Sequence, residues 1–126
     1  MALYEKTSRH NFTIVRFRDG DTVEGYLRCH CCGAASYDTL RILAIDSWEP
    51  KGPDSHKARD TAEHATKIYR GETGVLTTES IRRDKYGRIC ADVIINGTAL
   101  SLQLVKLKLA WWGVGEPEPH PDKLGQ

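Results

Sequence analysis

The sequence has no long apolar run and no large excess of charge of one sign. No stretch approaches the roughly 18 apolar residues that a membrane-spanning helix needs, which argues against a span within this chain. The formal net charge is only +1, so any affinity for nucleic acid must come from local clusters of basic residues. The 126 residues suffice for one domain with one core.

Cysteine is also scarce, and the N-terminal segment lacks an apolar stretch. Three of the four cysteines lie within residues 29–32 and the fourth is Cys90, a pattern that shows no disulfide framework. Residues 1–12 contain no apolar core of a signal peptide. We therefore expect reduced thiols and an intracellular, cytoplasmic protein that does not bind a membrane.

The segment Cys29-His30-Cys31-Cys32 allows two interpretations. It resembles half of a zinc site, although zinc sites usually separate paired cysteines by two residues. The second interpretation, which we favour, is a set of reduced thiols on a loop, open to oxidation or to dimer formation. Cys90 lies on a predicted strand and need not be near the other three.

Alternating apolar residues predict five short strands and one helix. The strands cover residues 11–18, 22–28, 37–45, 75–82 and 88–95. Asp-Gly at 19–20 and Asn-Gly at 96–97 are turn dipeptides typical of hairpins. A helix inserted after the third of five strands predicts a mainly β fold with α, a small five-stranded β-barrel of the OB type.

The predicted helix runs from Ser55, a candidate N-cap, to about Tyr69. The face that would pack on the sheet carries small side chains, at Ala58, Ala62 and Ala65. Residues 100–109 fit either a strand or a second helix, and their periodicity does not decide. Residues 116–126 contain three prolines, so we expect an extended or disordered tail after a single domain over residues 1–115.

Three short blocks combine acidic residues with arginines. They read Asp-Gly-Asp-Thr at 19–22, Arg41 followed by Asp-Ser-Trp-Glu at 46–49, and Asp-Lys-Tyr-Gly-Arg at 84–88. Carboxylates hold a hard cation and position a water, and arginines hold a phosphate. Cutting a phosphodiester needs both kinds of group, so these blocks predict nuclease chemistry.

Each block also has a purely structural interpretation. Residues 19–21 fit an ordinary turn. Arg41 interrupts an apolar strand, where a charge is costly without a partner, and an ion pair with Asp46 or Glu49 would explain it. Glu49 also fits a solvated loop, and the basic residues within 82–88 fit a solvated turn.

The order and spacing of the three blocks resemble the staphylococcal (thermonuclease-type) nuclease family. The resemblance covers roughly residues 13–112 and includes the Asn-Gly hairpin at 96–97. It implies an OB-type fold with a helix at 100–109, and a calcium-dependent endonuclease that hydrolyses DNA by metal-assisted water attack with low sequence specificity. RNA is left open as a second substrate. The alternative is a catalytically weak or silent module of the same fold that binds nucleic acid or a protein partner.

The resemblance also implies how the carboxylates would act. Asp21 and Asp46 correspond to calcium ligands, together with the backbone carbonyl of Ser47. So few carboxylates predict weak, sub-millimolar binding of calcium. Glu49 corresponds to the general base that activates the attacking water.

The basic residues correspond to phosphate contacts. Arg41 and Arg88 match the two arginines that grip the scissile phosphate. Lys85 and Tyr86 match positions that contact a neighbouring phosphate. Because a lysine cannot fork across two phosphate oxygens, we expect both arginines to be needed.

Some positions differ from the family pattern. Trp48 stands where the family usually has proline, so we expect the loop that holds Glu49 to lie differently. The tyrosines that flank the bound base in the secreted type enzyme have no counterparts in this sequence, where the segment contains Trp111 and Trp112. These tryptophans either stack on a base or complete the core, and we favour the core. The chain ends near the expected place of a last helix, so we expect that third helix to be absent.

Overall fold

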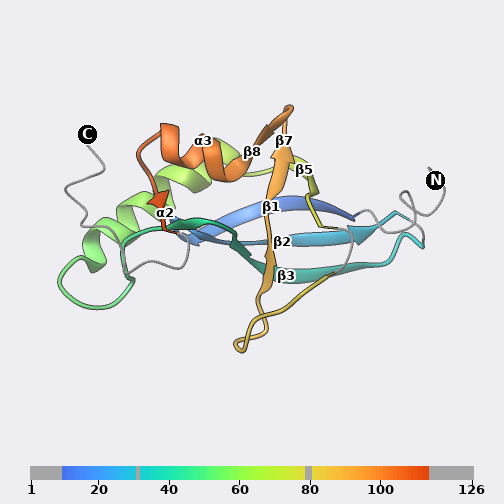
Figure 1. Cartoon of the computed structure of the whole chain (residues 1–126), viewed down its shortest axis with the longest axis horizontal. Coiled ribbons are helices and arrows are strands. Elements are labelled where there is room, and N and C mark those ends of the chain that lie inside the picture. The colour runs from blue at the N-terminus through green and yellow to red at the C-terminus, as the bar shows by residue number, and fades with distance from the viewer. Residues whose placement is uncertain (1–9, 31, 79–80, 114–126) are drawn as a thin grey trace.

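The structure is a computed structural model that describes residues 10–30, 32–78 and 81–113. The predicted tail at 116–126, the question of a third helix there, and Cys31 lie outside these residues. The strands are β1 (His10–Asp19), β2 (Thr22–Cys29), β3 (Ala35–Ile42), β4 (Ile45–Asp46), β5 (Thr73–Leu76), β6 (Ile89–Ala91), β7 (Val93–Ile95), β8 (Thr98–Ala99) and β9 (Trp111–Trp112), and the helices are α2 (Ser55–Tyr69) and α3 (Leu100–Lys106) (Figure 1). Neither helix has the length and apolar character needed to cross a membrane.

A single stretch of chain closes the main sheet into a barrel. The strand order is β6-β3-β2-β1-β5-β7-β8. β6 and β7 are two halves of residues 89–95, interrupted only at Asp92. β6 pairs in parallel with β3, and β7 pairs antiparallel with β5, so this stretch joins both edges of the sheet and crosses β1, β2 and β3 in Figure 1. The result is the mainly β, five-stranded OB-type arrangement that the sequence predicts.

Both helices pack against the barrel. α2 runs from Ser55 to Tyr69, as predicted, but Ser55 is its first residue and Asp54 is the N-cap, without a side-chain cap hydrogen bond. The buried face of α2 carries small side chains, at Ala58, Thr61, Ala62 and Ala65, which lets the helix lie close to β1. Residues 100–106 form α3, which confirms the helix that the family resemblance implies.

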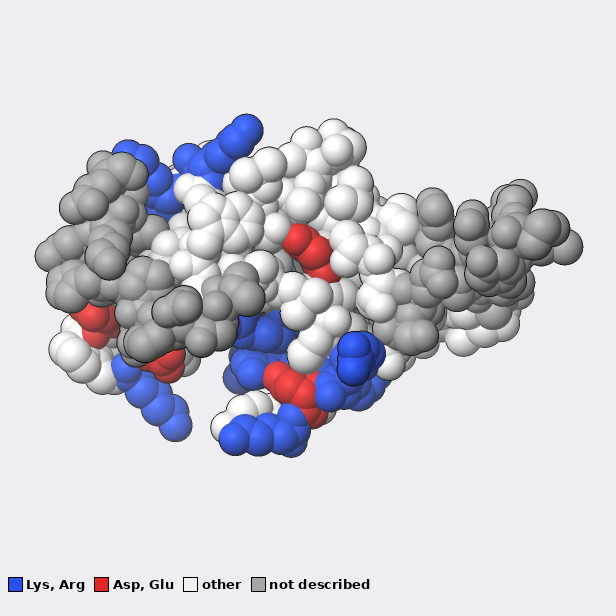
Figure 2. Space-filling view, viewed as in Figure 1, with Lys and Arg blue, Asp and Glu red and all other residues white. Residues whose placement is uncertain are grey.

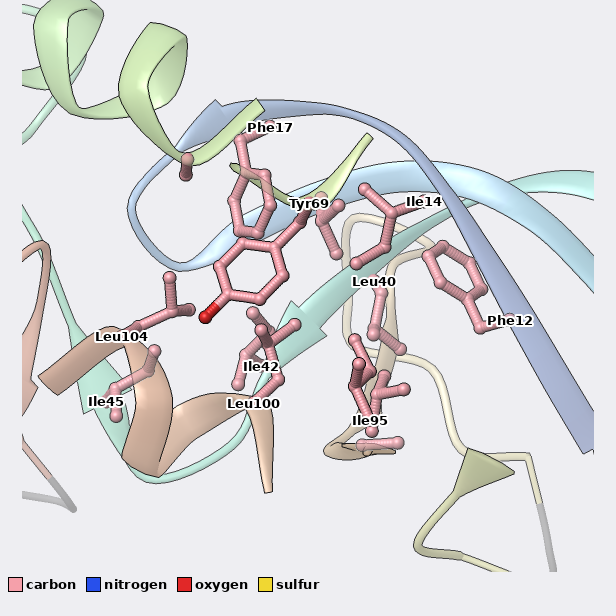
Figure 3. Packing of buried hydrophobic residues seen from close by; sticks show 14 of the residues in the cluster. Phe12, Ile14, Phe17, Leu40, Ile42, Ile45, Tyr69, Ile95, Leu100 and Leu104 are labelled. Carbon is pink, nitrogen blue, oxygen red and sulfur yellow. The ribbon is translucent and has the colours of Figure 1, made fainter. Parts of the chain in front are cut away.

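The core gathers side chains from the strands and both helices (Figure 3). The ring of Tyr69 lies 6.0 Å from that of Phe17 in β1. The Tyr69 hydroxyl donates a hydrogen bond to Gln103 Oε1 at 2.8 Å. The largest fully buried aromatic and aliphatic side chains include Phe12, Ile14, Leu40, Ile42, Leu100 and Leu104. This core fixes the ends of β1, β2 and β3, where the site forms.

Two predicted strands are shorter than expected. β3 ends at Ile42, and residues 43–44 form a turn in which Ala44 has a φ of 70°. The predicted strand at 75–82 is correct only for residues 75–76, since β5 ends at Leu76 and the other described residues of that range belong to no strand. The turn after β3 separates Arg41 from Asp46 and redirects the chain into the site.

Candidate active site

The first part of the site forms where β2 begins and β3 ends. Thr22 of β2 is paired in register with Arg41 of β3, and the backbone N–H of Ile42 donates to the carbonyl of Asp21 at 2.9 Å. Antiparallel pairing places neighbouring side chains within reach of each other. Arg41 Nη2 lies 3.4 Å from Asp21 Oδ2, so the first two motif blocks meet in an ion pair.

Asp46 joins this group from β4. Its Oδ1 lies 4.0 Å from Arg41 Nη2 and accepts the backbone N–H of Ser47 at 2.9 Å. The Ser47 hydroxyl donates to the carbonyl of Leu109 at 3.0 Å, and β4 pairs with β9. The segment that follows α3 therefore holds Asp46 and Ser47 beside Arg41.

The carboxyl groups here are strongly perturbed. Asp21 is only 7% exposed. Burial raises the pKa of Asp21 to about 7, helped by a hydrogen bond and the negative charge from Asp19 and opposed by Arg41. Burial also raises the pKa of Asp46, and the neighbouring Asp21 adds to that rise. The guanidinium of Arg41 lowers both pKa values but does not offset the effect of burial.

A hard divalent cation fits this donor set. Calcium takes carboxylate and carbonyl oxygens as ligands, and its charge would favour the ionised form of Asp21 and Asp46, whose pKa values are raised chiefly by burial. The described residues contain no group of three or more His, Cys, Asp or Glu side chains placed to hold a metal. A cation at this position would therefore rely on two carboxylates, the Ser47 carbonyl and waters.

The second part of the site is the turn that precedes β6. Asp84 Oδ1 accepts the backbone N–H groups of Tyr86 and Arg88, each at 2.9 Å, and its Oδ2 accepts Arg88 Nε at 2.7 Å. The Arg88 guanidinium and the Lys85 ammonium lie 5.2 and 5.3 Å from the centre of the Tyr86 ring. Figure 2 shows basic and acidic side chains gathered over this turn, at the lower margin of the view.

A cavity of about 670 Å³ lies next to both parts. Its walls include Asp19, Thr22, Pro50, Tyr86 and Arg88. Asp21 does not line the cavity, but it lies between the lining residues Asp19 and Thr22 in the sequence. Glu49 does not line it either, but it directly precedes the lining residue Pro50. Arg41 and Asp46 do not line the cavity. The site thus consists of one compact group around Arg41 and a second group around Arg88, with the cavity beside both.

Glu49 is not brought into contact with either group. It is exposed in the loop between β4 and α2, and in the described part of the chain no hydrogen bond or ion pair joins it to another residue. The neighbouring Trp48 anchors this loop, since its ring lies 5.2 Å from that of Trp111, edge to face at 87°. Among the described residues Glu49 is therefore an unpaired carboxylate, next to a tryptophan that packs on Trp111.

The two tryptophans of β9 have different environments. Trp111 is 6% exposed, as its predicted core role requires, whereas Trp112 is 47% exposed and the core prediction is wrong for it. Successive residues of a strand point to opposite faces, which explains the difference.

The structure gives roles to two motif residues that the sequence left without one. The Thr22 hydroxyl donates to Asp21 Oδ1 at 2.9 Å. Asp84 holds the Arg88 guanidinium, as described above. Asp84 and Arg88 are four residues apart on either side of a glycine, and this spacing could have predicted their ion pair. Nothing in the sequence distinguishes Thr22 from an ordinary turn residue.

Gly20 is required by a close approach of three segments. A Cβ at this position would lie 2.1 Å from Ser47 Oγ and 2.4 Å from the carbonyl oxygen of Leu109. Only glycine fits at such an approach. The turn that carries Asp21 is thereby pressed against the segment that carries Asp46.

The cysteine loop remains apart from this site. Cys32 is exposed between β2 and β3, Cys90 lies in β6, and neither forms a disulfide within the described residues. Because Cys31 lies outside those residues, both the zinc interpretation and the reduced-thiol interpretation of residues 29–32 stay predictions.

Comparison with known proteins agrees with the resemblance. A family profile described as "Staphylococcal nuclease homologue" matches residues 39–125. "Endonuclease YncB" of Bacillus subtilis (strain 168) is 32% identical over 105 residues, which cover 79% of this chain and 46% of that protein. "SPbeta prophage-derived endonuclease YokF" of the same strain is 33% identical over 103 residues, which cover 78% of this chain and 32% of that protein. The chain thus spans less than half the length of each of these curated relatives.

Proposed function

The chain belongs to the staphylococcal nuclease family, and from that premise we propose that it is a calcium-dependent endonuclease. It hydrolyses phosphodiester bonds of DNA with low sequence specificity, and RNA is a second candidate substrate. The observation that carries this proposal is the convergence of Asp21 and Asp46 on Arg41, at 3.4 and 4.0 Å. The endonuclease names of both Bacillus relatives support the same reaction class.

In this proposal Asp21, Asp46 and the Ser47 carbonyl hold the cation. When bound, calcium neutralises charge on a phosphate oxygen and favours ionisation of an attacking water. The residues themselves are held ready by Thr22, which donates to one oxygen of Asp21, and by the Ser47 N–H, which donates to Asp46. These hydrogen bonds orient the carboxylates before a substrate arrives.

The two arginines hold the phosphate whose bond is cut. Arg41 lies in the carboxylate group, and Arg88 lines the adjacent cavity, where Asp84 orients its guanidinium. Each guanidinium donates in a fork that matches two phosphate oxygens. Negative charge builds on those oxygens as the water attacks, so donors fixed in advance lower the barrier.

Glu49 and the residues around Arg88 complete the assignment. Glu49 acts as the general base that takes the proton of the attacking water, since it is a carboxylate without a protein partner among the described residues. Lys85 and Tyr86 contact a neighbouring phosphate. The ring of Tyr86, which is 70% exposed, is accessible to the nucleic-acid strand.

One observation favours a second candidate function. Glu49 contacts neither Asp21 nor Arg41, so the base is not in place without substrate. A module that binds nucleic acid or a protein partner and cuts weakly or not at all would have the same geometry. Apo geometry is often looser than that of a substrate complex, which leaves the endonuclease as the first proposal.

The deciding experiment follows single-stranded DNA with the wild type in calcium, the wild type in a chelator, and Glu49→Gln in calcium. We expect rapid cutting by the wild type in calcium, none in chelator, and cutting about a hundredfold or more slower for Glu49→Gln. Asp60→Asn, which removes an exposed carboxylate of α2, is the matched control and should cut at the wild-type rate. Equal cutting in calcium and in chelator would refute the calcium-dependent mechanism, and no cutting with intact binding would favour the silent module.

A further inference from the structure

A second and larger cavity lies on the side of the barrel that α2 covers. Its volume is about 810 Å³, and its walls come from the second half of β1, one edge of α2, and Pro50. The charged residues on these walls are Arg16, Arg18, Arg59, Lys67 and Arg70, with Glu63 as the one acidic residue among them. We call this cavity, with these six residues, the basic groove.

The groove is a consequence of how the barrel is built. β5 pairs with β1 only at residues 11–13, so the later part of β1 faces α2 instead of a described strand. The backbone N–H of Phe17 donates to Thr66 Oγ1 of α2 at 2.8 Å. Strand and helix are thus held together with small residues between them, which gives the groove rigid walls.

Most of the positive charge in the groove is not neutralised. Arg16 and Arg18 both pair with Glu24, through Nε atoms at 2.9 and 3.4 Å, while their side chains stay 61% and 56% exposed. Two arginines therefore share one carboxylate. Their terminal nitrogens remain available to a ligand.

The basic residues of α2 are less neutralised still. Arg59, Lys67 and Arg70 are exposed, and among the described residues no acidic side chain lies within ion-pair distance of them. At separations of eight and eleven residues they follow one edge of the helix. Glu63 lies on the same edge, four residues from both Arg59 and Lys67, so three basic groups face one acidic group there. The excess of positive charge on this edge favours a polyanion that lies along it.

The basic groove adjoins the cavity beside the candidate active site. Arg18 and Pro50 line both. A phosphate chain bound beside Arg88 and Tyr86 would therefore have Arg18 as a basic neighbour toward the edge of α2. The cavity beside the candidate active site is also lined by Asp19 and Asp38, so the excess of positive charge lies on the side of the basic groove.

We propose that the basic groove binds the phosphates of a single nucleic-acid strand on one side of the bond that is cut. This inference deepens the proposed endonuclease function and rests on it for the direction of the path. Binding in the groove involves charge and no base edges, so it adds affinity for long strands without adding sequence specificity. A dinucleotide is too short to use it.

The test removes two charges from the groove with Arg59→Gln/Arg70→Gln, which keeps long polar side chains on the helix. The matched control is Arg28→Gln/Lys106→Gln, which removes two exposed charges from residues that line neither cavity. Binding is measured in chelator, so that nothing is cut, with a single strand of about 12 nucleotides, within the range that one OB fold covers. Thermal melting of both variants verifies that they fold.

We expect the groove variant to bind the long strand roughly tenfold more weakly at low salt, and its log-log salt slope to fall by about 0.7 for each lost phosphate contact. The control should lose much less. With calcium, the groove variant should raise KM for long DNA and leave cutting of a dinucleotide unchanged. Wild-type affinity and salt slope in the groove variant, or an equal loss in the control, would overturn the proposal.

The outcomes separate this inference from the proposed function. If the wild type cuts DNA and the groove variant behaves as the wild type, the endonuclease proposal stands and the groove proposal fails. If the wild type cuts no diester but binds DNA through Arg59 and Arg70, the groove proposal stands and the endonuclease proposal fails. Tight binding of polyglutamate with no binding of DNA would assign the groove to an acidic protein and overturn the inference.

Discussion

Asp21 is the residue at which stability and the proposed function conflict most clearly. Its carboxyl group is buried close to Asp19 and Asp46, and burial first of all raises the pKa of Asp21 to about 7. In the unfolded chain the same group ionises near its ordinary value of about 3.9. The folded protein therefore binds the proton more tightly, and its stability falls as the pH rises from about 4 through about 7.

The first prediction concerns Asp21→Asn. Asparagine cannot ionise, so in chelator the variant should melt several degrees above the wild type at a pH of about 8.5, and the difference should shrink toward a pH of about 5. Calcium should raise the melting temperature of the wild type but not of the variant. Asp60→Asn is the control, with no expected change. A variant that melts below the wild type at the higher pH would mean that the ion pair with Arg41 outweighs burial.

The second prediction concerns the two arginines. Arg41→Lys and Arg88→Lys should each reduce the cutting rate by about 10²–10³, which corresponds to roughly 2.7–4 kcal/mol of lost transition-state stabilisation. The charge is kept, but the fork across two phosphate oxygens is lost. Arg28→Lys, an exposed change on β2, should have no effect. A near-normal rate in either site variant would remove that arginine from the mechanism.

At the scale of elements, the loop between β4 and α2 depends on one aromatic contact. Trp48 stands where the family usually has proline, and its ring packs edge to face on Trp111 at 5.2 Å. Trp111 in turn lies in β9, paired with β4. This packing restrains the loop by contact with a strand, as a proline would by fixing the backbone.

The third prediction follows from that contact. Trp48→Ala should let the loop that holds Glu49 move, and a displacement of about 1 Å is enough to reduce the rate up to a hundredfold. Trp48→Phe keeps an aromatic ring and should retain most of the activity. Trp112→Ala, at the exposed neighbouring position, should change neither activity nor melting temperature. A wild-type rate in Trp48→Ala would show that the loop needs no anchor.

Local patterns predict the elements of this fold better than their ends. Period-two alternation and the spaced alanines identify β1, β2 and α2 because those signals lie within each element. The end of β3 was mispredicted because Ala44 takes a positive φ, which residue type does not reveal for an alanine. The predicted strand at 75–82 is too long, because the pairing of β5 with β7 ends at Leu76.

At the scale of the whole molecule, long-range pairing decides both the barrel and the site. That residues 89–95 pair with both β3 and β5 is not visible in their own sequence. The meeting of Asp21 with Arg41 depends on the register of Thr22 opposite Arg41, and a shift by one residue would turn Arg41 to the other face. The family resemblance, and no local pattern, singles out Asp21, Arg41 and Asp46 as candidate site residues, and the strand pairing explains why Asp21 meets Arg41.

The distribution of charge also emerges only at this scale. A net charge of +1 gives no sign of a polyanion-binding surface. Folding places Arg88, Arg18 and the basic edge of α2 along two adjoining cavities, while Asp21 is buried. The molecule is nearly neutral overall, and the basic groove carries five basic residues and one acidic residue.

The central claim is that Asp21 and Asp46 hold a cation beside the diester that is cut. It is tested most directly by the rate of single-stranded DNA cutting as calcium is titrated, for the wild type and for Asp46→Asn. The account predicts that wild-type cutting saturates at sub-millimolar calcium and stops in chelator, and that Asp46→Asn needs at least about tenfold more calcium. Cutting that persists in chelator, or the same calcium dependence in both proteins, would contradict it.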